Sequence, residues 1–143
     1  MTDSSDQNTD TEQPVRVEDL AHEIAALTWD LKGLNTEVID VRGIVSYTDL
    51  IVITTGTSER QIQAIARHVE SEMRMLGYRP LHSEGSDGTR WVLLDFDDVI
   101  VHIFHEEARE EYALERMWPD APRVTFDDAP KALYGHFDMK RFN

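Results

Sequence analysis

Residues 49–77, DLIVITTGTSERQIQAIARHVESEMRMLG, contain the clearest structural pattern in the chain. Residues 49–55 are nearly all apolar or β-branched, which is typical of a strand that is covered on both faces. Ser58 lies three residues before Gln61, a capping-box spacing in which each side chain can bond the other's backbone N–H. Apolar residues then recur at helical spacing up to Gly77, which fits a left-handed helix terminator. The stretch predicts a buried strand followed by an amphipathic helix that is long enough for a parallel crossover.

The elements on either side follow from helical and strand periodicity. Gly33 is expected to stop the first helix, and Pro119 and Pro122 to end the last one. Besides the strand and helix above, the predicted elements are a helix over 17–31, strands over 36–41, 79–83, 90–96 and 99–104, and a helix over 106–117. Their order, α-β-β-α-β-β-β-α, predicts a single α/β domain with a mixed five-stranded sheet flanked by helices.

The last two strands are predicted to form a hairpin across Asp97 and Asp98. In that register one face is wholly apolar and should face the core. Its pairs are Phe96 with Val99, Leu94 with Val101, and Val92 with Ile103. The reverse face pairs Asp95 with Ile100, Leu93 with His102, and Trp91 with Phe104. Either a helix covers this reverse face, or part of it is a docking surface with a tryptophan anchor. The sequence pattern leaves both alternatives open.

Charge limits the partners of the chain. Its 143 residues include 28 Asp and Glu against 14 Lys and Arg, a net charge of −14, and no cysteine. Nucleic-acid binding depends on basic residues that neutralise phosphates, so no DNA partner is expected and rRNA contact is at most incidental. An acidic domain suits a basic protein partner, although the same charge can also serve solubility alone. The lack of cysteine excludes disulfides and thiolate metal sites.

The two ends of the chain differ in composition from the middle. Residues 1–14 have too little apolar surface to offset the entropy of ordering, so they are predicted to be a disordered acidic tail. Residues 15–124 are predicted to be the folded domain. Residues 125–143 are expected to be a mobile C-terminal extension, with Tyr134 and Phe137 as its candidate packing residues. No apolar run is long enough for a membrane span, and the N-terminus has no signal or transit pattern, so we expect a cytoplasmic protein.

Two groups of polar residues suggest nucleotide chemistry, but their spacing argues against it. Asp95 and Asp97 lie on the same side of a strand and could hold Mg²⁺. The Gly-Thr-Ser stretch at 56–58 could receive a phosphate at a helix start. In nucleotidyltransferases the acidic pair follows such a turn within about a helix length, whereas here residues 59–94 intervene. The histidines lack the spacing of a zinc site. No catalytic residue, metal or cofactor is therefore expected.

Several linked motifs resemble the ribosomal silencing factor (RsfS, or Iojap) family. In the first half these are DVRG (40–43), YTD (47–49) and IVITTGTSERQIQAIARHVE (51–70). In the second half the matching stretch is EGSDGTRWVLLDFDDVIVHIFHEEAREEYALERMWPDAPRV (84–124). The resemblance covers about residues 17–124. The chain departs from the family pattern at Asp97 and Asp98, where a glycine is common, and at Ala113, where a polar residue is expected.

The resemblance implies a nucleotidyltransferase-like α/β/α fold without catalytic machinery, and a homodimer. It also implies binding to a large-subunit ribosomal protein of the L-fourteen type. A bound member blocks joining of the small subunit and represses translation, whereas organelle relatives assist assembly of the large subunit. This mechanism is steric and needs no cofactor. An assembly factor that uses the same docking site is the first alternative, and a divergent nucleotidyltransferase is the second.

By resemblance, Trp91 is the first residue expected at the partner interface. The other expected interface residues are Leu93, Asp95 and His102 from the hairpin, and Tyr112 and Glu115 from the last helix. A second set of family signature residues is expected to be structural, around the start of the second helix. Its members are Asp49, Gly56, Ser58, Arg60 and Gln61.

Overall fold

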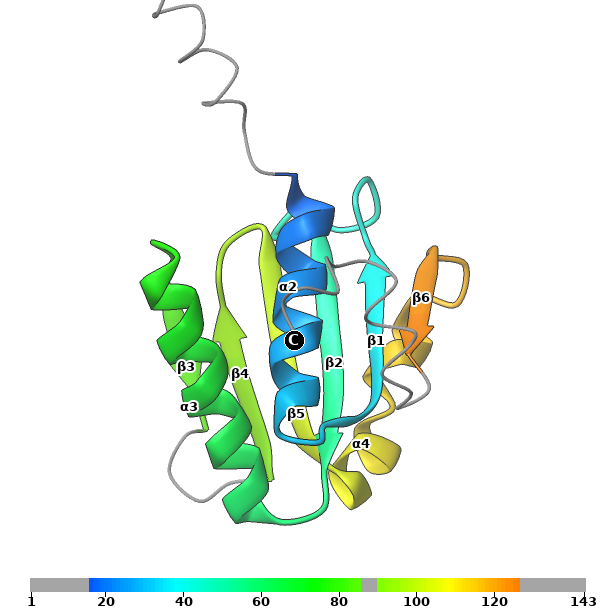
Figure 1. Cartoon of the computed structure of the whole chain (residues 1–143). Helices are drawn as coiled ribbons and strands as arrows, with labels where there is room; N and C mark the ends of the chain where they lie inside the picture. Colours follow the sequence, from blue (N-terminus) through cyan, green and yellow to red (C-terminus); the bar gives the residue numbers. More distant parts are fainter. Residues whose placement is uncertain (1–15, 86–89, 127–143) are drawn as a thin grey trace, which may run out of the picture.

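A mixed sheet with helices on both faces forms the fold in the computed structural model, which describes residues 16–85 and 90–126 (Figure 1). In chain order the elements are α2 (Val17–Asp30), β1 (Leu34–Asp40), β2 (Leu50–Gly56), α3 (Glu59–Met75), β3 (His82–Glu84), β4 (Trp91–Asp95), β5 (Val99–His105), α4 (Glu106–Tyr112), the 3-10 helix η1 (Leu114–Met117) and β6 (Arg123–Phe126). The predicted α/β class and the element types are confirmed.

The described part of the chain has six strands in the order β3-β4-β5-β2-β1-β6. The strands β2 and β5 pair in parallel, and every other pair is antiparallel. The prediction of five strands is wrong because β6 adds to the free edge of β1, with Val38 opposite Val124. This edge strand, Arg-Val-Thr-Phe, alternates polar and apolar residues over only four positions, the shortest run in which alternation indicates a strand. It begins inside the predicted domain and ends at Phe126, inside the predicted extension. The predicted tail at 1–14 and residues 127–143 lie outside the described residues.

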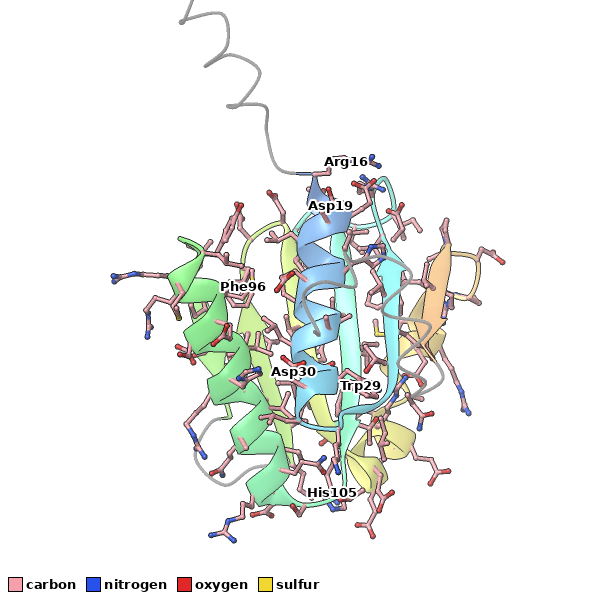
Figure 2. The ribbon with its side chains drawn as sticks, in the orientation of Figure 1. Arg16, Asp19, Trp29, Asp30, Phe96 and His105 are labelled. Carbon is pink, nitrogen blue, oxygen red and sulfur yellow. The ribbon has the colours of Figure 1, made fainter. Side chains whose placement is uncertain are left out.

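The hairpin register predicted from the sequence is confirmed. Val92 lies opposite Ile103, and Trp91 lies opposite Phe104. The apolar face of the hairpin packs under α2 and α3, which cover the front of the sheet, while α4 lies behind it (Figure 1). All seven residues of β2 are buried, because they have packed layers on both sides. Figure 2 shows Asp30 on the side of α2 that faces α3, where its carboxylate lies 3.1 Å from the imidazole of His68.

The cap of α3 differs in part from the predicted reciprocal box. The Gln61 amide N–H donates to Ser58 Oγ at 3.1 Å, as expected. The side chain of Gln61, however, accepts from the Thr57 amide at 2.7 Å instead of the Ser58 amide. Its own NH₂ group donates to the carbonyls of Leu31 and Lys32 at 3.0 and 3.1 Å. Gln61 therefore joins the start of α3 to the end of α2.

Two predicted helix ends need correction, and one is confirmed. Lys32, with a φ of 67°, is the left-handed residue after α2, and Gly33 is required for a different reason. A Cβ at Gly33 would lie 2.5 Å from Thr54 Oγ1, so only glycine lets the chain pass this close to β2. Gly77, with a φ of 96°, is confirmed as left-handed. The helix predicted over 106–117 ends instead at Tyr112.

The break after α4 occurs at Ala113, whose φ of 46° and ψ of 47° are left-handed. Alanine is the strongest helix former, so the sequence carries no local signal for this break. A left-handed conformation costs a non-glycine residue about 1–2 kcal/mol. The 3-10 helix η1 then continues the chain in a new direction.

We expect Ala113→Gly to stabilise the protein by about 1 kcal/mol, because glycine adopts the left-handed conformation without strain. The free energy of unfolding, measured by urea denaturation, is the readout. Ala64→Gly, the same change inside α3, is the control and should destabilise by about 1 kcal/mol. Equal losses in the two variants would contradict the strain assigned to Ala113.

Candidate functional site

Four aromatic rings gather on the sheet face that carries α4. Trp91 of β4 lies 4.8 Å, between ring centroids, from both Phe104 of β5 and Tyr112 of α4. The His102 ring stacks on Phe104 at 6.0 Å, with an angle of 10° between the ring planes. Alternation along β4 and β5 places Trp91, His102 and Phe104 on one face, and α4 brings Tyr112 against them. Strand alternation predicted the first three on one face, and the structure places Tyr112, which the family resemblance had suggested, against them.

The helix α4 covers part of this aromatic cluster and leaves part of it open. Phe104 is fully buried, and His102 is 7% exposed. Trp91 is only partly buried, and Tyr112 is 51% exposed. The helix α4 therefore covers the β5 side of the face and leaves an open hollow over β4. The described residues that line this hollow are Glu84, Gly85, Arg90, Trp91, Leu93, Ala108 and Tyr112.

His102 fixes the orientation of the Trp91 side chain through a hydrogen bond. The indole N–H of Trp91 donates to His102 Nδ1 at 3.0 Å, which requires Nδ1 to be unprotonated. Burial lowers the pKa of His102 from its usual 6.5 to about 4, so the ring is neutral near pH 7. This hydrogen bond also occupies the one donor of the indole. The part of Trp91 that faces the hollow is therefore an apolar ring surface.

Two of the expected interface residues lie apart from the hollow. Asp95 is at the far end of β4, opposite Ile100, and its carboxylate accepts the Asp97 amide at 2.8 Å. It thereby closes the hairpin turn, in which Asp97 has a φ of 78°. Glu115 of η1 pairs with Arg109, with 3.3 Å between Nε and Oε2. The structure thus brings together Trp91, Leu93, His102 and Tyr112.

The charged rim of the hollow, defined as Arg90 in its lining and the two carboxylates that Arg90 pairs with, was not identified from the sequence. Arg90 lies directly before Trp91, and its guanidinium is 3.6 Å from the Glu107 carboxylate and 3.2 Å from that of Glu111. The two glutamates are one helical turn apart on α4, as are Ala108 and Tyr112 of the lining. This i, i+4 spacing beside Tyr112 was the available sequence signal for an acidic rim.

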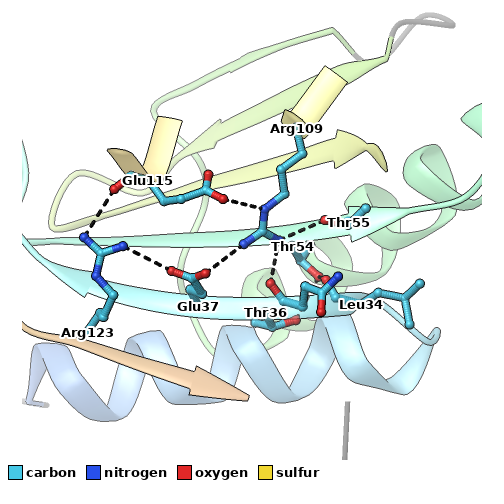
Figure 3. Close-up of polar contacts among 9 residues, drawn as sticks. Leu34, Thr36, Glu37, Thr54, Thr55, Arg109, Glu115 and Arg123 are labelled. Atoms are coloured by element: carbon cyan, nitrogen blue, oxygen red, sulfur yellow. Dashed lines mark hydrogen bonds and ion pairs between the residues drawn. The ribbon is translucent and has the colours of Figure 1, made fainter. Parts of the chain in front are cut away.

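A buried arginine anchors α4 to the sheet. Arg109 is 7% exposed, and its guanidinium bonds Thr55 Oγ1 at 2.9 Å and the Glu37 carboxylate at 3.2 Å (Figure 3). It also pairs with Glu115, and Glu37 pairs in turn with Arg123 of β6 at 3.5 Å. These contacts join α4, η1 and β6 to β1 and β2. Because α4 has only seven residues, the anchor at Arg109 positions Tyr112 over Trp91.

The residues expected to be structural lie at opposite ends of β2. Gly56 ends β2, and a Cβ there would lie 3.0 Å from Ile62 Cγ1. Ser58, Arg60 and Gln61 lie next to it at the start of α3. Asp49 does not belong to this group, because it lies at the opposite end of β2. There its amide donates to the Asp98 carbonyl at 3.0 Å and joins the strand to the hairpin turn.

The two halves of a nucleotide site are not brought together. The turn at 56–58 follows β2, at the end of the sheet where β5 reaches His105. Asp95 lies beside Ile100, near the start of β5. A seven-residue strand separates these ends by roughly 20 Å. In residues 16–85 and 90–126, no three His, Asp or Glu side chains are grouped to hold a metal ion, and no helix is long and apolar enough to cross a membrane.

Acidification should destabilise the fold through His102. Below pH 6.5 the unfolded chain takes up a proton at this residue that the folded chain does not bind until about pH 4. The stability is therefore complete above pH 6.5 and falls as the pH drops toward 4, by about 2 kcal/mol at pH 5.

Urea denaturation at pH 7 and pH 5 measures this loss. His102→Asn is the control, because its side-chain carbonyl can still accept the indole N–H but does not titrate. Carboxylates titrate alike in both proteins, so the difference between them reports on His102. Parallel pH dependence in the two proteins would remove His102 as the cause.

This chain is similar in sequence and in fold to known proteins. A family model described as "Ribosomal silencing factor during starvation" matches residues 14–140. The ribosomal silencing factor RsfS of Bacillus subtilis is 39% identical over 103 residues, which are 72% of this chain and 87% of that protein. A crystal structure of a protein from Chromobacterium violaceum matches with a TM-score of 0.71 and 28% identity, covering 73% of this chain and 88% of that one.

An organelle protein shows a shorter similarity. The mouse protein named "Mitochondrial assembly of ribosomal large subunit protein 1" is 34% identical over 84 residues, which are 57% of this chain and 37% of that protein. The family model, in contrast, spans nearly the whole chain, and the fold and hairpin register agree with the motifs noted in the sequence. The chain therefore belongs to the ribosomal silencing factor family.

Proposed function

We propose that this protein binds the large ribosomal subunit through its L-fourteen-type protein and blocks joining of the small subunit. The name of the bacterial relative supports a role at the ribosome, and the name of the mouse relative points to the large subunit. The hollow over β4 is the observation that carries the proposal. It combines partly exposed aromatic rings with carboxylates on its rim, which suits a basic protein surface.

The proposed mechanism is steric exclusion, with no bond made or broken. A folded domain seated on the intersubunit face of the large subunit occupies the volume that the small subunit needs. Trp91 and Tyr112 supply the apolar anchor, and Leu93 extends it along β4. The net charge of −14 speeds the encounter with a basic protein and disfavours rRNA, so any rRNA contact is incidental.

The remaining interface residues have graded roles in this proposal. His102 acts by holding the indole of Trp91. Asp95 lies at the end of the same strand and would meet the partner only if the contact extends to the hairpin turn. Glu115 acts through Arg109, which anchors the helix that carries Tyr112. We further propose that the protein acts in the cytoplasm, forms a homodimer, and needs no cofactor.

A role in assembly of the large subunit is the second candidate, favoured by the name of the mouse relative. Both roles use the same docking surface, so they differ in their consequences and not in their contacts. Silencing predicts that the purified protein lowers the yield of joined ribosomes when it is mixed with mature subunits. An assembly role predicts that cells without the protein accumulate incomplete large subunits, which sucrose gradients resolve.

We expect Trp91→Ala to weaken binding to purified large subunits by about 2 kcal/mol, roughly thirtyfold in Kd, because it removes the central aromatic anchor. Co-sedimentation at two salt concentrations measures the affinity. Urea denaturation of the variant establishes that it is folded. The same variant should fail to block subunit joining.

Trp29→Ala is the matched control, since Trp29 of α2 is a partly buried tryptophan that packs on the opposite side of the sheet. It should leave the affinity for large subunits unchanged. If Trp91→Ala bound as tightly as the native chain, the hollow would not be the docking site. If the native chain failed to sediment with large subunits at either salt concentration, the proposed function would be wrong.

A further inference from the structure

Arg90 is the one cation among the described residues that line the hollow over β4. Its side chain is 44% exposed and extends from the start of β4 toward α4. There it pairs with Glu107 and Glu111, at 3.6 and 3.2 Å. The Glu107 and Glu111 side chains are themselves 76% and 61% exposed. An arginine of the same chain therefore already pairs with both of these rim carboxylates.

These ion pairs add little to the stability of the fold. Exposed pairs typically contribute less than about 1 kcal/mol, because water and salt screen them. The helix α4 is already held by the buried Arg109, so it does not depend on Arg90 for its position. The backbone of Arg90 has a separate role, since its carbonyl accepts the His105 amide at 2.8 Å. That contact does not depend on the arginine side chain.

The Arg90 side chain should affect the binding of a basic partner more than that of any other. A lysine or arginine that approaches Glu107 and Glu111 meets a cation that already holds them, and the two cations repel each other. The partner must displace the Arg90 guanidinium or accept weaker pairing. A charge on the rim of an interface acts mainly on the association rate and on its salt dependence.

We propose that Arg90 is a specificity-determining residue that limits how tightly and how fast the hollow binds a basic protein surface. This inference rests on the proposed function, because it takes the ribosomal partner to be basic. Arg90 occupies the carboxylates in the free protein, so a partner cation binds there by exchange. Partners that lack the apolar contact with Trp91 and Tyr112 then gain too little from charge alone to remain bound.

The test compares variants of the full chain in their association with purified large subunits, at low and high salt. Arg90→Gln removes the charge and should raise the association rate and the affinity by about three- to tenfold at low salt. The gain should shrink at high salt, because screening weakens the freed carboxylates. Arg90→Lys keeps the charge and should stay within about twofold of the native chain.

Arg74→Gln is the matched control. Arg74 lies on α3 at the opposite face of the sheet, is 52% exposed, and pairs with Glu70 at 3.7 Å. This variant has the same net charge as Arg90→Gln, so it isolates position from total charge. It should change the affinity by less than about twofold, because its charge is far from the hollow.

The possible results distinguish a failure of the Arg90 proposal from a failure of the proposed function. If Arg90→Gln binds more weakly than the native chain, or equally well, while Trp91→Ala loses binding, the function stands and the role of Arg90 is wrong. An equal gain in Arg74→Gln would assign the effect to net charge and would also overturn the proposal. If the native chain and all variants fail to bind, both the function and the inference fall.

Discussion

The buried guanidinium of Arg109 is the contact on which the geometry of the candidate site depends. A buried charge without partners would cost several kcal/mol, so the partners of Arg109 must be in place for the fold to form. Thr55 comes from β2, Glu37 from β1 and Glu115 from η1. Three separate elements are thereby fixed around one helix of seven residues, which is too short to be stable alone. The location of Tyr112 follows from this network.

The centre of the sheet was predictable because its pattern is local. Alternation along residues 90–104 allows one hairpin register with a wholly apolar face, and a shift by one residue would expose that face. The continuous apolar run of β2 likewise indicates burial on both sides. The edge strand β6 was missed because its alternation spans only four residues, and its place in the sheet depends on pairing with β1 and on the ion pair between Arg123 and Glu37. Contacts between residues far apart in the chain decide these elements.

The sequence predicted the aromatic members of the candidate site, but not Arg90 and its two carboxylate partners. Strand alternation places Trp91, Leu93 and His102 on one face, whichever layer covers it. Which of them meets solvent depends on how far α4 extends across the sheet, and that is set by Arg109. Tyr112 and Glu115 would share one face of an unbroken helix, being three residues apart. The left-handed turn at Ala113 separates them, so one joins the hollow and the other joins the buried network.

In the proposed function, the hollow would bind its partner through two kinds of contact. The Trp91 ring packs against Phe104 and Tyr112, and its N–H is bonded to His102. Because these contacts already restrict the Trp91 side chain, it loses little conformational entropy on binding. Such preorganised apolar contact acts mainly on the rate of dissociation. The carboxylates of α4 are exposed and screened, so they act mainly on the rate of encounter. The proposed steric mechanism needs both kinds of contact. Slow dissociation would keep the other subunit excluded, and charge would direct the approach toward a basic protein and away from rRNA.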